Sequence, residues 1–147
     1  METVIAIDPG SEKTGLAVVT VPNRLLMKAV VPTAAVAAEV ARCLEAYAAT
    51  VIVIGDGTRS AQHRERLAKL SPVAAGDVRI VTVDERHTTE MATARYWREH
   101  PLCGWRRWIP TSWQSPPVPV DDYAAWILAE KYGGCEMPEP LPYLTEE

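Results

Sequence analysis

Residues 4–19, with the sequence VIAIDPGSEKTGLAVV, constrain the fold of this chain more than any other stretch. The first four are an apolar, β-branched-rich run that ends abruptly at Asp8, as expected for a strand buried on both faces. Pro9 lacks a backbone N–H and Gly10 tolerates a positive φ, so the chain must turn here. Residues 15–21 predict a second strand, and the two runs form a β-hairpin with the loop SEKT.

Asp8 is therefore expected at the carboxyl edge of a central strand, with its carboxylate directed out of the sheet. An aspartate that merely caps a turn explains this residue equally well when it is considered alone. A functional reading gains weight only if other carboxylates occupy equivalent positions.

The remaining pattern predicts an α/β domain with one mixed sheet flanked by helices. The first three strands are expected to be antiparallel, and the last two to join as parallel crossovers. The elements after the hairpin are a strand at 23–32, a helix at 33–49, a strand at 51–54, a polar helix at 60–70, a loop at 72–77, a strand at 78–83, and helices at 88–100 and 121–132. Thr33 is a plausible N-cap of its helix, and Thr88 or Thr89 of theirs.

The length of 147 residues predicts one domain with a proper core, which we assign to residues 1–134. Residues 135–147, rich in Pro and Glu, are predicted to be an extended or disordered tail. No apolar run approaches the ~20 residues of a membrane span, and no signal pattern opens the chain. The three scattered cysteines form no metal or disulfide pattern, so we expect a cytoplasmic protein without a membrane partner.

The net charge of −4 argues against a generally adhesive nucleic-acid binder. The distribution is uneven, because glutamates crowd the tail while arginines collect in the middle of the chain. Local charge matters more than the total for a site that grips one phosphate.

Three acids stand at functional edges of the predicted sheet. Asp8 ends the first strand, Glu85 follows the fifth, and Asp121 opens the last helix. In open α/β sheets ligands bind beyond the carboxyl ends of the strands. Converging carboxylates repel one another unless cations lie between them, and oxygen ligands favour Mg²⁺ or Mn²⁺. The alternatives are a solvated or capping role for Glu85 and an N-cap role for Asp121.

Three motifs together resemble the YqgF (RuvX) family: DPGSEKTG followed by an apolar strand, VDERHTTEMA, and VDDYAAWILAEKY. The resemblance spans roughly residues 3–133. The first motif is shared with RuvC and loosely with actin-like kinases, whereas the DERxTT stretch is more particular to YqgF. The resemblance implies an RNase H-like fold, as in small single-domain nucleases related to the RuvC Holliday-junction resolvases.

The resemblance also implies roles for individual residues. Asp8, Glu85 and Asp121 occupy the family's catalytic and metal-binding positions, which would take Mg²⁺ or Mn²⁺. Arg86 is either a phosphate contact or half of a structural ion pair. The residues expected to bind substrate are Arg86, Lys13, Thr58, Arg59 and Ser60.

Two departures from the family pattern bear on function. The usual Gly-hydrophobic-Pro turn after the fourth strand reads GDGTRS here, where Asp56 adds negative charge although Gly57, Thr58 and Ser60 could still donate to a phosphate. The usual Lys/Arg-rich stretch before the last helix is replaced by WRRWIPTSWQSPPVP, within a long irregular segment at 101–120.

Tryptophans are the main aromatic feature of the second half of the chain. We expect Trp97 and Trp126 to pack in the core. Trp105, Trp108 and Trp113 either pack on the core or stack on unpaired bases.

The first functional hypothesis is a Mg²⁺-dependent phosphodiesterase acting on structured RNA or branched DNA. The resemblance suggests processing of the 5′ end of precursor 16S rRNA, with Holliday-junction resolution as a second substrate for the same chemistry. The second hypothesis is a non-catalytic nucleic-acid or ribosome-assembly binding module. An actin-like phosphotransferase would need a second Asp-Gly hairpin and a longer chain.

Overall fold

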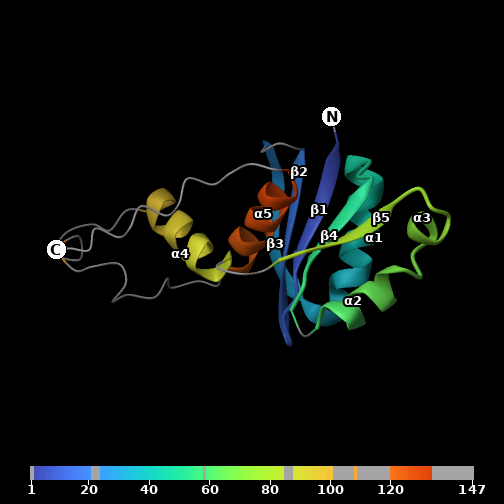
Figure 1. Ribbon diagram of the computed structural model, residues 1–147, viewed down its shortest axis with the longest axis horizontal. Coiled ribbons are helices and arrows are strands. Elements are labelled where there is room, and N and C mark those ends of the chain that lie inside the picture. The colour runs from blue at the N-terminus through green and yellow to red at the C-terminus, as the bar shows by residue number, and fades with distance from the viewer. Residues whose placement is uncertain are drawn as a thin grey trace.

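The computed structural model describes residues 2–20, 24–57, 59–84, 88–100, 108 and 120–133 (Figure 1). Five strands and five α-helices make up these parts of the chain. In chain order they are β1 (Thr3–Asp8), β2 (Lys13–Thr20), β3 (Arg24–Pro32), a 3₁₀ turn η1 (Thr33–Ala35), α1 (Val36–Tyr47), β4 (Val51–Gly55), α2 (Ser60–Leu67), α3 (Ser71–Ala74), β5 (Arg79–Val83), α4 (Thr88–Glu99) and α5 (Asp121–Tyr132).

The strands form one mixed sheet in the order β3-β2-β1-β4-β5. The pairs β1–β2 and β2–β3 are antiparallel, and the pairs β1–β4 and β4–β5 are parallel. This arrangement confirms the predicted α/β class and the predicted change from antiparallel to parallel pairing. β1 lies at the centre of the sheet, so the acid at its end has neighbouring strands on both sides.

Alternate residues of β1 face different layers of helix, as the period of a strand requires. Ile5 and Ile7 pack in the cluster that includes α1, whereas Val4 and Ala6 pack in the cluster that includes α5. All four side chains are fully buried, which is why the strand reads as a continuous apolar run. Figure 1 shows α1 and α5 on different sides of the sheet, with α4 beyond α5.

A third apolar cluster joins α4 to α5, with Tyr96 and Ile127 among its buried residues. Trp97 and Trp126 are partly buried against it, so the prediction that they pack in the core is confirmed. Trp108 is 78 % exposed, and Trp105 and Trp113 lie outside the described residues.

The α4–α5 contact also contains a buried ion pair. The Arg95 guanidinium donates to both carboxylate oxygens of Glu130, at 2.7 and 2.9 Å. The side chain of Glu130 is 0 % exposed and that of Arg95 is 10 % exposed. The Arg95 guanidinium also lies 4.4 Å from the centroid of the Trp126 ring. Bidentate geometry and ring stacking compensate the loss of hydration that burial imposes on both charges.

Two local predictions were wrong. Thr33 does not cap a helix: it opens η1, α1 begins at Val36, and the N-cap residue Ala35 makes no side-chain cap bond. The predicted loop after α2 contains the short helix α3, with Pro72 in its first turn, where the missing N–H of proline costs nothing.

The remaining predictions concern membrane spans, the tail of the chain and the extent of the domain. Among the described residues, no helix is long and apolar enough to cross a membrane. The tail at 135–147 and most of the segment at 101–120 lie outside the described residues. The assignment of residues 1–134 to one domain stays a prediction.

Breaking the buried ion pair should cost much more than breaking an exposed one. We expect Glu130→Gln to lower the free energy of unfolding by about 3–5 kcal/mol, because it leaves the Arg95 charge buried and uncompensated. Urea denaturation followed by circular dichroism measures this loss.

The matched control is Glu39→Gln, which breaks the exposed Glu39–Arg42 pair and should cost less than about 1 kcal/mol. The double variant Arg95→Met/Glu130→Leu should recover most of the lost stability, because no unpaired charge remains. Equal losses in the two single variants would contradict a buried role for Glu130.

Candidate active site

Asp8 is the last residue of β1, and the alternation of the strand places it on the face that α5 covers. It pairs with Gly15 of β2 across the antiparallel ladder. Gly15 lies on the same face, because Ala17 and Val19 of that strand pack in the cluster with α5. The end of β1 and the start of β2 therefore present Asp8 and Gly15 side by side toward the first turn of α5.

Gly15 allows α5 to approach the sheet very closely. A Cβ at this residue would overlap the backbone carbonyl of Asp121 and would lie 2.9 Å from the backbone nitrogen of Asp122. The first turn of α5 therefore rests directly on residue 15, where only glycine fits without a shift of backbone. Asp8 and Asp121, which are 113 positions apart in the sequence, thus lie on either side of this contact.

The Asp121 carboxyl is half-buried in a setting that disfavours its charge. Burial raises its pKa above the ordinary value of 3.8, and the adjacent charge of Asp122 raises it further. The Lys13 ammonium opposes both effects, which shows that this lysine lies near Asp121. Asp121 follows the N-cap residue Val120, which makes no side-chain cap bond, so Asp121 is not the N-cap.

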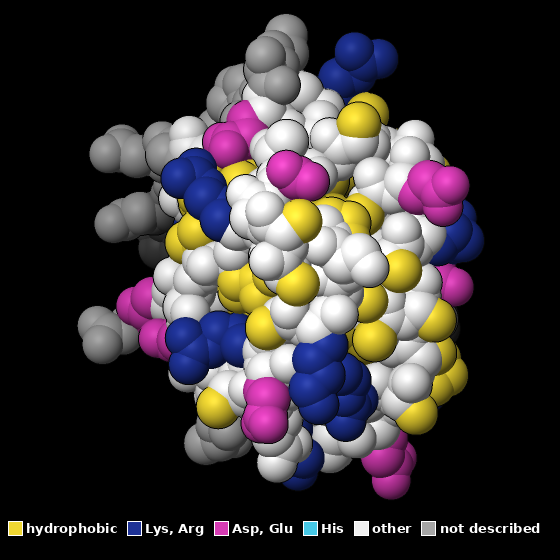
Figure 2. Space-filling model, turned by 90° about the vertical axis from the view of Figure 1, so that its right-hand side faces the viewer, with side chains coloured by type: hydrophobic (Ala, Val, Ile, Leu, Met, Phe, Trp, Pro, Cys, Tyr) yellow, Lys and Arg dark blue, Asp and Glu magenta, His cyan; other side chains and the backbone are white. Residues whose placement is uncertain are grey.

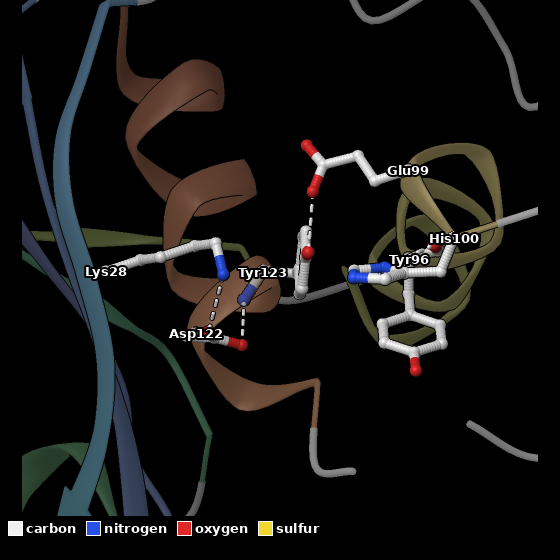
Figure 3. A network of polar contacts seen from close by, with 6 residues as sticks. All are labelled: Lys28, Tyr96, Glu99, His100, Asp122 and Tyr123. Atoms are coloured by element: carbon white, nitrogen blue, oxygen red, sulfur yellow. Dashed lines mark hydrogen bonds and ion pairs between the residues drawn. The ribbon is translucent and has the colours of Figure 1, made fainter. Parts of the chain in front are cut away.

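Asp122 is held by structural contacts on the same face (Figure 3). One of its carboxylate oxygens accepts a hydrogen bond from the Lys28 ammonium of β3 at 3.1 Å, and the other accepts one from the Tyr123 backbone N–H at 2.9 Å. Lys28 also lies 4.3 Å from the centroid of the Tyr123 ring, a cation–π distance. This role for Lys28 could not be predicted from neighbouring residues, because it depends on the register that sets Lys28 opposite Ala17.

Tyr123 continues the network toward α4. Its hydroxyl donates to a Glu99 carboxylate oxygen at 2.6 Å, and Figure 3 shows Glu99 reaching over from α4. Burial raises the pKa of Tyr123, and the hydrogen bond to Glu99 raises it further, so the phenol remains a donor. Tyr96 packs edge-on against Tyr123 and stacks on His100. These contacts fix the start of α5 between β3 and α4.

The hairpin loop beside Asp8 is closed by a ring of hydrogen bonds. The Thr33 hydroxyl donates to the Gly10 carbonyl at 3.0 Å, so the Thr14 hydroxyl donates to Thr33 at 2.9 Å. Thr14 in turn accepts from the Gly10 N–H at 3.4 Å. Thr33, predicted as a helix cap, thus joins the loop to the start of η1.

The end of β4 reaches the same edge of the sheet. The Asp56 N–H donates to the Val83 carbonyl at 3.0 Å, and the Ser60 N–H donates to the Gly57 carbonyl at 3.0 Å. Ser60 therefore keeps its hydroxyl, and not its N–H, as a donor for a phosphate. Arg59 is exposed at the start of α2.

Some predicted site residues fall where the structure gives no description. Thr58, Glu85 and Arg86 lie outside the described residues. Asp84, the residue before Glu85, is described: its carbonyl accepts a hydrogen bond from the Lys131 ammonium of α5 at 3.1 Å. α5 therefore contacts Gly15, the strand partner of Asp8, through its first turn, and Asp84, the residue before Glu85, through its last turn.

Solved structures with the same arrangement of sheet and helices include two of RuvC from Thermus thermophilus. One, a complex with Holliday junction substrate, has a TM-score of 0.55 and 19 % sequence identity over 88 % of this chain and 91 % of that one. The other has a TM-score of 0.54 and 18 % identity, over 87 % of this chain and 90 % of that one. This chain has an RNase H-like fold. No protein-family model matches the sequence, and no curated protein matches it significantly.

The RNase H-like fold brings two of the three predicted acids to one edge. Asp8 ends β1 beside Gly15, and the first turn of α5, which begins with Asp121, packs on Gly15. Glu85 stays a prediction. Within the described residues no three His, Cys, Asp or Glu side chains form a group that could hold a metal ion. The Asp121 carboxyl is half-buried, and this burial and the charge of the Asp122 carboxylate both raise its pKa. This setting fits a divalent cation, because a cation would relieve the unfavourable charge of Asp121.

Adding a side chain at residue 15 should disturb the packing of α5 against the sheet. We expect Gly15→Ala to lower the free energy of unfolding by about 1–3 kcal/mol, because the new methyl group meets backbone that must shift. Gly76→Asn is the matched control: its site is open and its φ of +85° suits asparagine better than other side chains. Equal urea midpoints for wild type and Gly15→Ala would contradict the close contact.

The raised pKa of Asp121 makes a pH-dependent prediction for the metal-free protein. The folded state binds this proton more tightly than the unfolded state, so stability falls as pH rises from below 3.8 through the folded pKa. In EDTA, Asp121→Asn should therefore melt at a higher temperature than wild type at pH 7, and the difference should shrink toward acid pH.

Thermal unfolding monitored by circular dichroism across this pH range checks the prediction. Glu45→Gln, which removes an exposed carboxylate from α1, serves as the control and should give no such pH-dependent difference. A lower melting temperature for Asp121→Asn at neutral pH would mean that the Asp121 charge is stabilised in the folded protein.

Proposed function

We propose that this protein is a divalent-metal-dependent nuclease that hydrolyses phosphodiester bonds in structured nucleic acid. The observation that carries the proposal is the contact at Gly15, where the backbone of the first turn of α5, which carries Asp121, packs on the residue that pairs with Asp8. The RNase H-like fold supports a phosphodiester-cleaving site, since solved structures with this fold include RuvC, one of them in complex with Holliday junction substrate.

Asp8, Asp121 and Glu85 are the residues that would hold Mg²⁺ or Mn²⁺. Such ions supply Lewis-acid polarisation of the phosphate and activation of water when bound. The protein's own contribution would be to position these groups: the first turn of α5 packs on Gly15, and Lys28 forms an ion pair with Asp122, the neighbour of Asp121.

Cationic and hydroxyl groups around this edge would bind the substrate backbone. Lys13, whose charge lowers the pKa of Asp121, would neutralise a phosphate at the site. Arg59 and the Ser60 hydroxyl would contact a phosphate at the end of β4, with Thr58 and Arg86 completing the predicted set. Contacts of this kind position a nucleic acid without reading its sequence.

The substrate that the resemblance to the YqgF (RuvX) family suggests is the 5′ end of precursor 16S rRNA. A four-way DNA junction is the second candidate, favoured by the likeness to RuvC in complex with Holliday junction substrate. The same phosphodiester chemistry serves both, and a ribosomal precursor would be the partner in the first case.

Cleavage assays with purified protein test the nuclease. In Mg²⁺ or Mn²⁺ we expect cleavage of a precursor rRNA fragment or a four-way DNA junction, and no cleavage in EDTA. Asp8→Asn, Glu85→Gln and Asp121→Asn should each reduce the rate by at least about 10²-fold, because each removes several kcal/mol of charge stabilisation. Glu39→Gln, a carboxylate removed from the surface of α1, should cleave like wild type.

A parallel melting experiment separates the nuclease from a non-catalytic binding module. Mn²⁺ should raise the melting temperature of wild type and raise it less in Asp8→Asn and Asp121→Asn, because a bound ligand stabilises the folded state by mass action. Nucleic-acid binding that persists in EDTA, without any Mn²⁺ shift and without cleavage, would favour the binding module instead.

A further inference from the structure

α2 and its flanking residues form a positively charged surface on a chain whose net charge is −4. Residues 59–69 contain four cations and one acid, Glu65. All four cations are exposed, and none of them takes part in an ion pair with another described residue. The cations are Arg59, Arg64, Arg66 and Lys69.

Three of these cations lie along one side of the helix. His63 and Leu67 are buried and define the inner face of α2. Arg59, directly before α2, and Arg66, on its last turn, follow one flank of that face at i and i+7, and Lys69 lies in the turn two residues beyond the end of the helix. Burial lowers the pKa of His63, and the charges of Arg66 and Arg59 lower it further, which shows that both guanidinium groups lie near this flank. We call these three residues the α2 stripe.

The α2 stripe starts at the edge of the sheet that carries the proposed active site. β4 runs parallel to β1 and ends at Gly55, beside the end of β1 at Asp8. α2 begins five residues later and leads away from that edge, low and to the right in Figure 1. In the view from that side, Lys and Arg side chains gather in the lower half of the molecule, at the height of α2 (Figure 2).

The dimensions of the stripe suit a nucleic-acid strand. The eight residues of α2 rise about 12 Å, which is the axial length of about three to four nucleotides of one strand of a duplex. Arginine binds phosphate through two parallel hydrogen bonds, and lysine binds it as a point charge. A row of such groups can follow consecutive phosphates of one strand.

The composition of the exposed face argues against other partners. Its uncharged members are Ala61, Gln62 and Ala68, with no aromatic or large aliphatic side chain. Protein interfaces depend on buried aromatic and large apolar anchors, which this face lacks. A membrane-surface helix must insert its apolar face into lipid, whereas the apolar face of α2 is already buried through Leu67.

We propose that the α2 stripe is a second binding surface for the phosphodiester backbone of the substrate, contacting the strand that leads away from the scissile phosphate. This inference rests on the proposed nuclease function and extends it: Arg66 and Lys69 bind phosphates remote from the cut. Arg59 joins the two surfaces, because it stands where the edge of the sheet meets α2.

The salt dependence of binding tests the α2 stripe. Two fluorescein-labelled probes are used in EDTA, a four-way DNA junction and a precursor rRNA fragment, and the affinity of each is measured by fluorescence anisotropy between about 50 and 200 mM salt. For Arg66→Gln/Lys69→Gln we expect the slope of log affinity against log salt to become shallower by about 1 per residue removed. The probe that shows the larger change identifies the type of nucleic acid that the stripe binds.

The control variant removes the same charge from elsewhere. Arg24→Gln/Arg42→Gln changes Arg24, at the start of β3 on the opposite edge of the sheet, and Arg42, on α1. This variant should keep the wild-type slope. Equal slope changes in the two double variants would overturn the stripe, because they would reflect net charge alone, and so would an unchanged slope in Arg66→Gln/Lys69→Gln.

The outcomes for the stripe and for the nuclease are separable. A protein that cleaves its substrate while Arg66→Gln/Lys69→Gln keeps the wild-type slope overturns only the stripe. A wild-type protein that neither cleaves nor binds either probe overturns the nuclease and the stripe together. Binding with the predicted slope change and wild-type-like cleavage of saturated substrate by Arg66→Gln/Lys69→Gln supports a contact remote from the chemistry.

Discussion

The rest of the structure depends on how closely α5 packs against the sheet. At one end the helix rests on the bare backbone of Gly15, and at the other the Tyr132 hydroxyl donates to Glu2 at 3.0 Å, just before β1. Between these ends Ala125 and Ala129 face the sheet with small side chains. Two short residues and one glycine thus let a helix from the end of the chain lie against its first two strands, where their backbones can determine the position of its opening acids.

Much of this fold follows from local pattern. The continuous apolar runs, the turn residues after β1 and the glycines after α5 were sufficient to predict three features. These are the order of the five strands along the chain, their antiparallel or parallel pairing, and the bounds of α5. Local pattern failed where the role of a residue depends on a contact with a residue far away in the sequence. Thr33 looks like a cap but bonds to Gly10, and the pairing of Lys28 with Asp122 joins positions 94 apart. Neither register nor long-range packing is encoded in a window of neighbouring residues.

The candidate site shows the same division. The positions of Asp8 at the end of a strand and of Asp121 at the start of a helix could be predicted, because a strand end and a helix start have clear sequence signatures. The importance of Gly15 could not, because a glycine inside a strand pattern has several explanations, and only the packed helix decides among them. Net charge was similarly uninformative: the acidic total conceals a helix, α2, whose solvent face is strongly basic.

The ring of hydrogen bonds in the hairpin loop has a consequence for how precisely the two acids can be aligned. The loop after Asp8 is fastened to the layer that begins with Thr33 on one face of the sheet, while Asp121 approaches from the opposite face. The sheet therefore separates the two supports of these acids, which are the loop bonded to Thr33 for Asp8 and the helix α5 for Asp121. The backbone geometry that holds these two supports exists before any ligand arrives, so holding them in place consumes no binding energy.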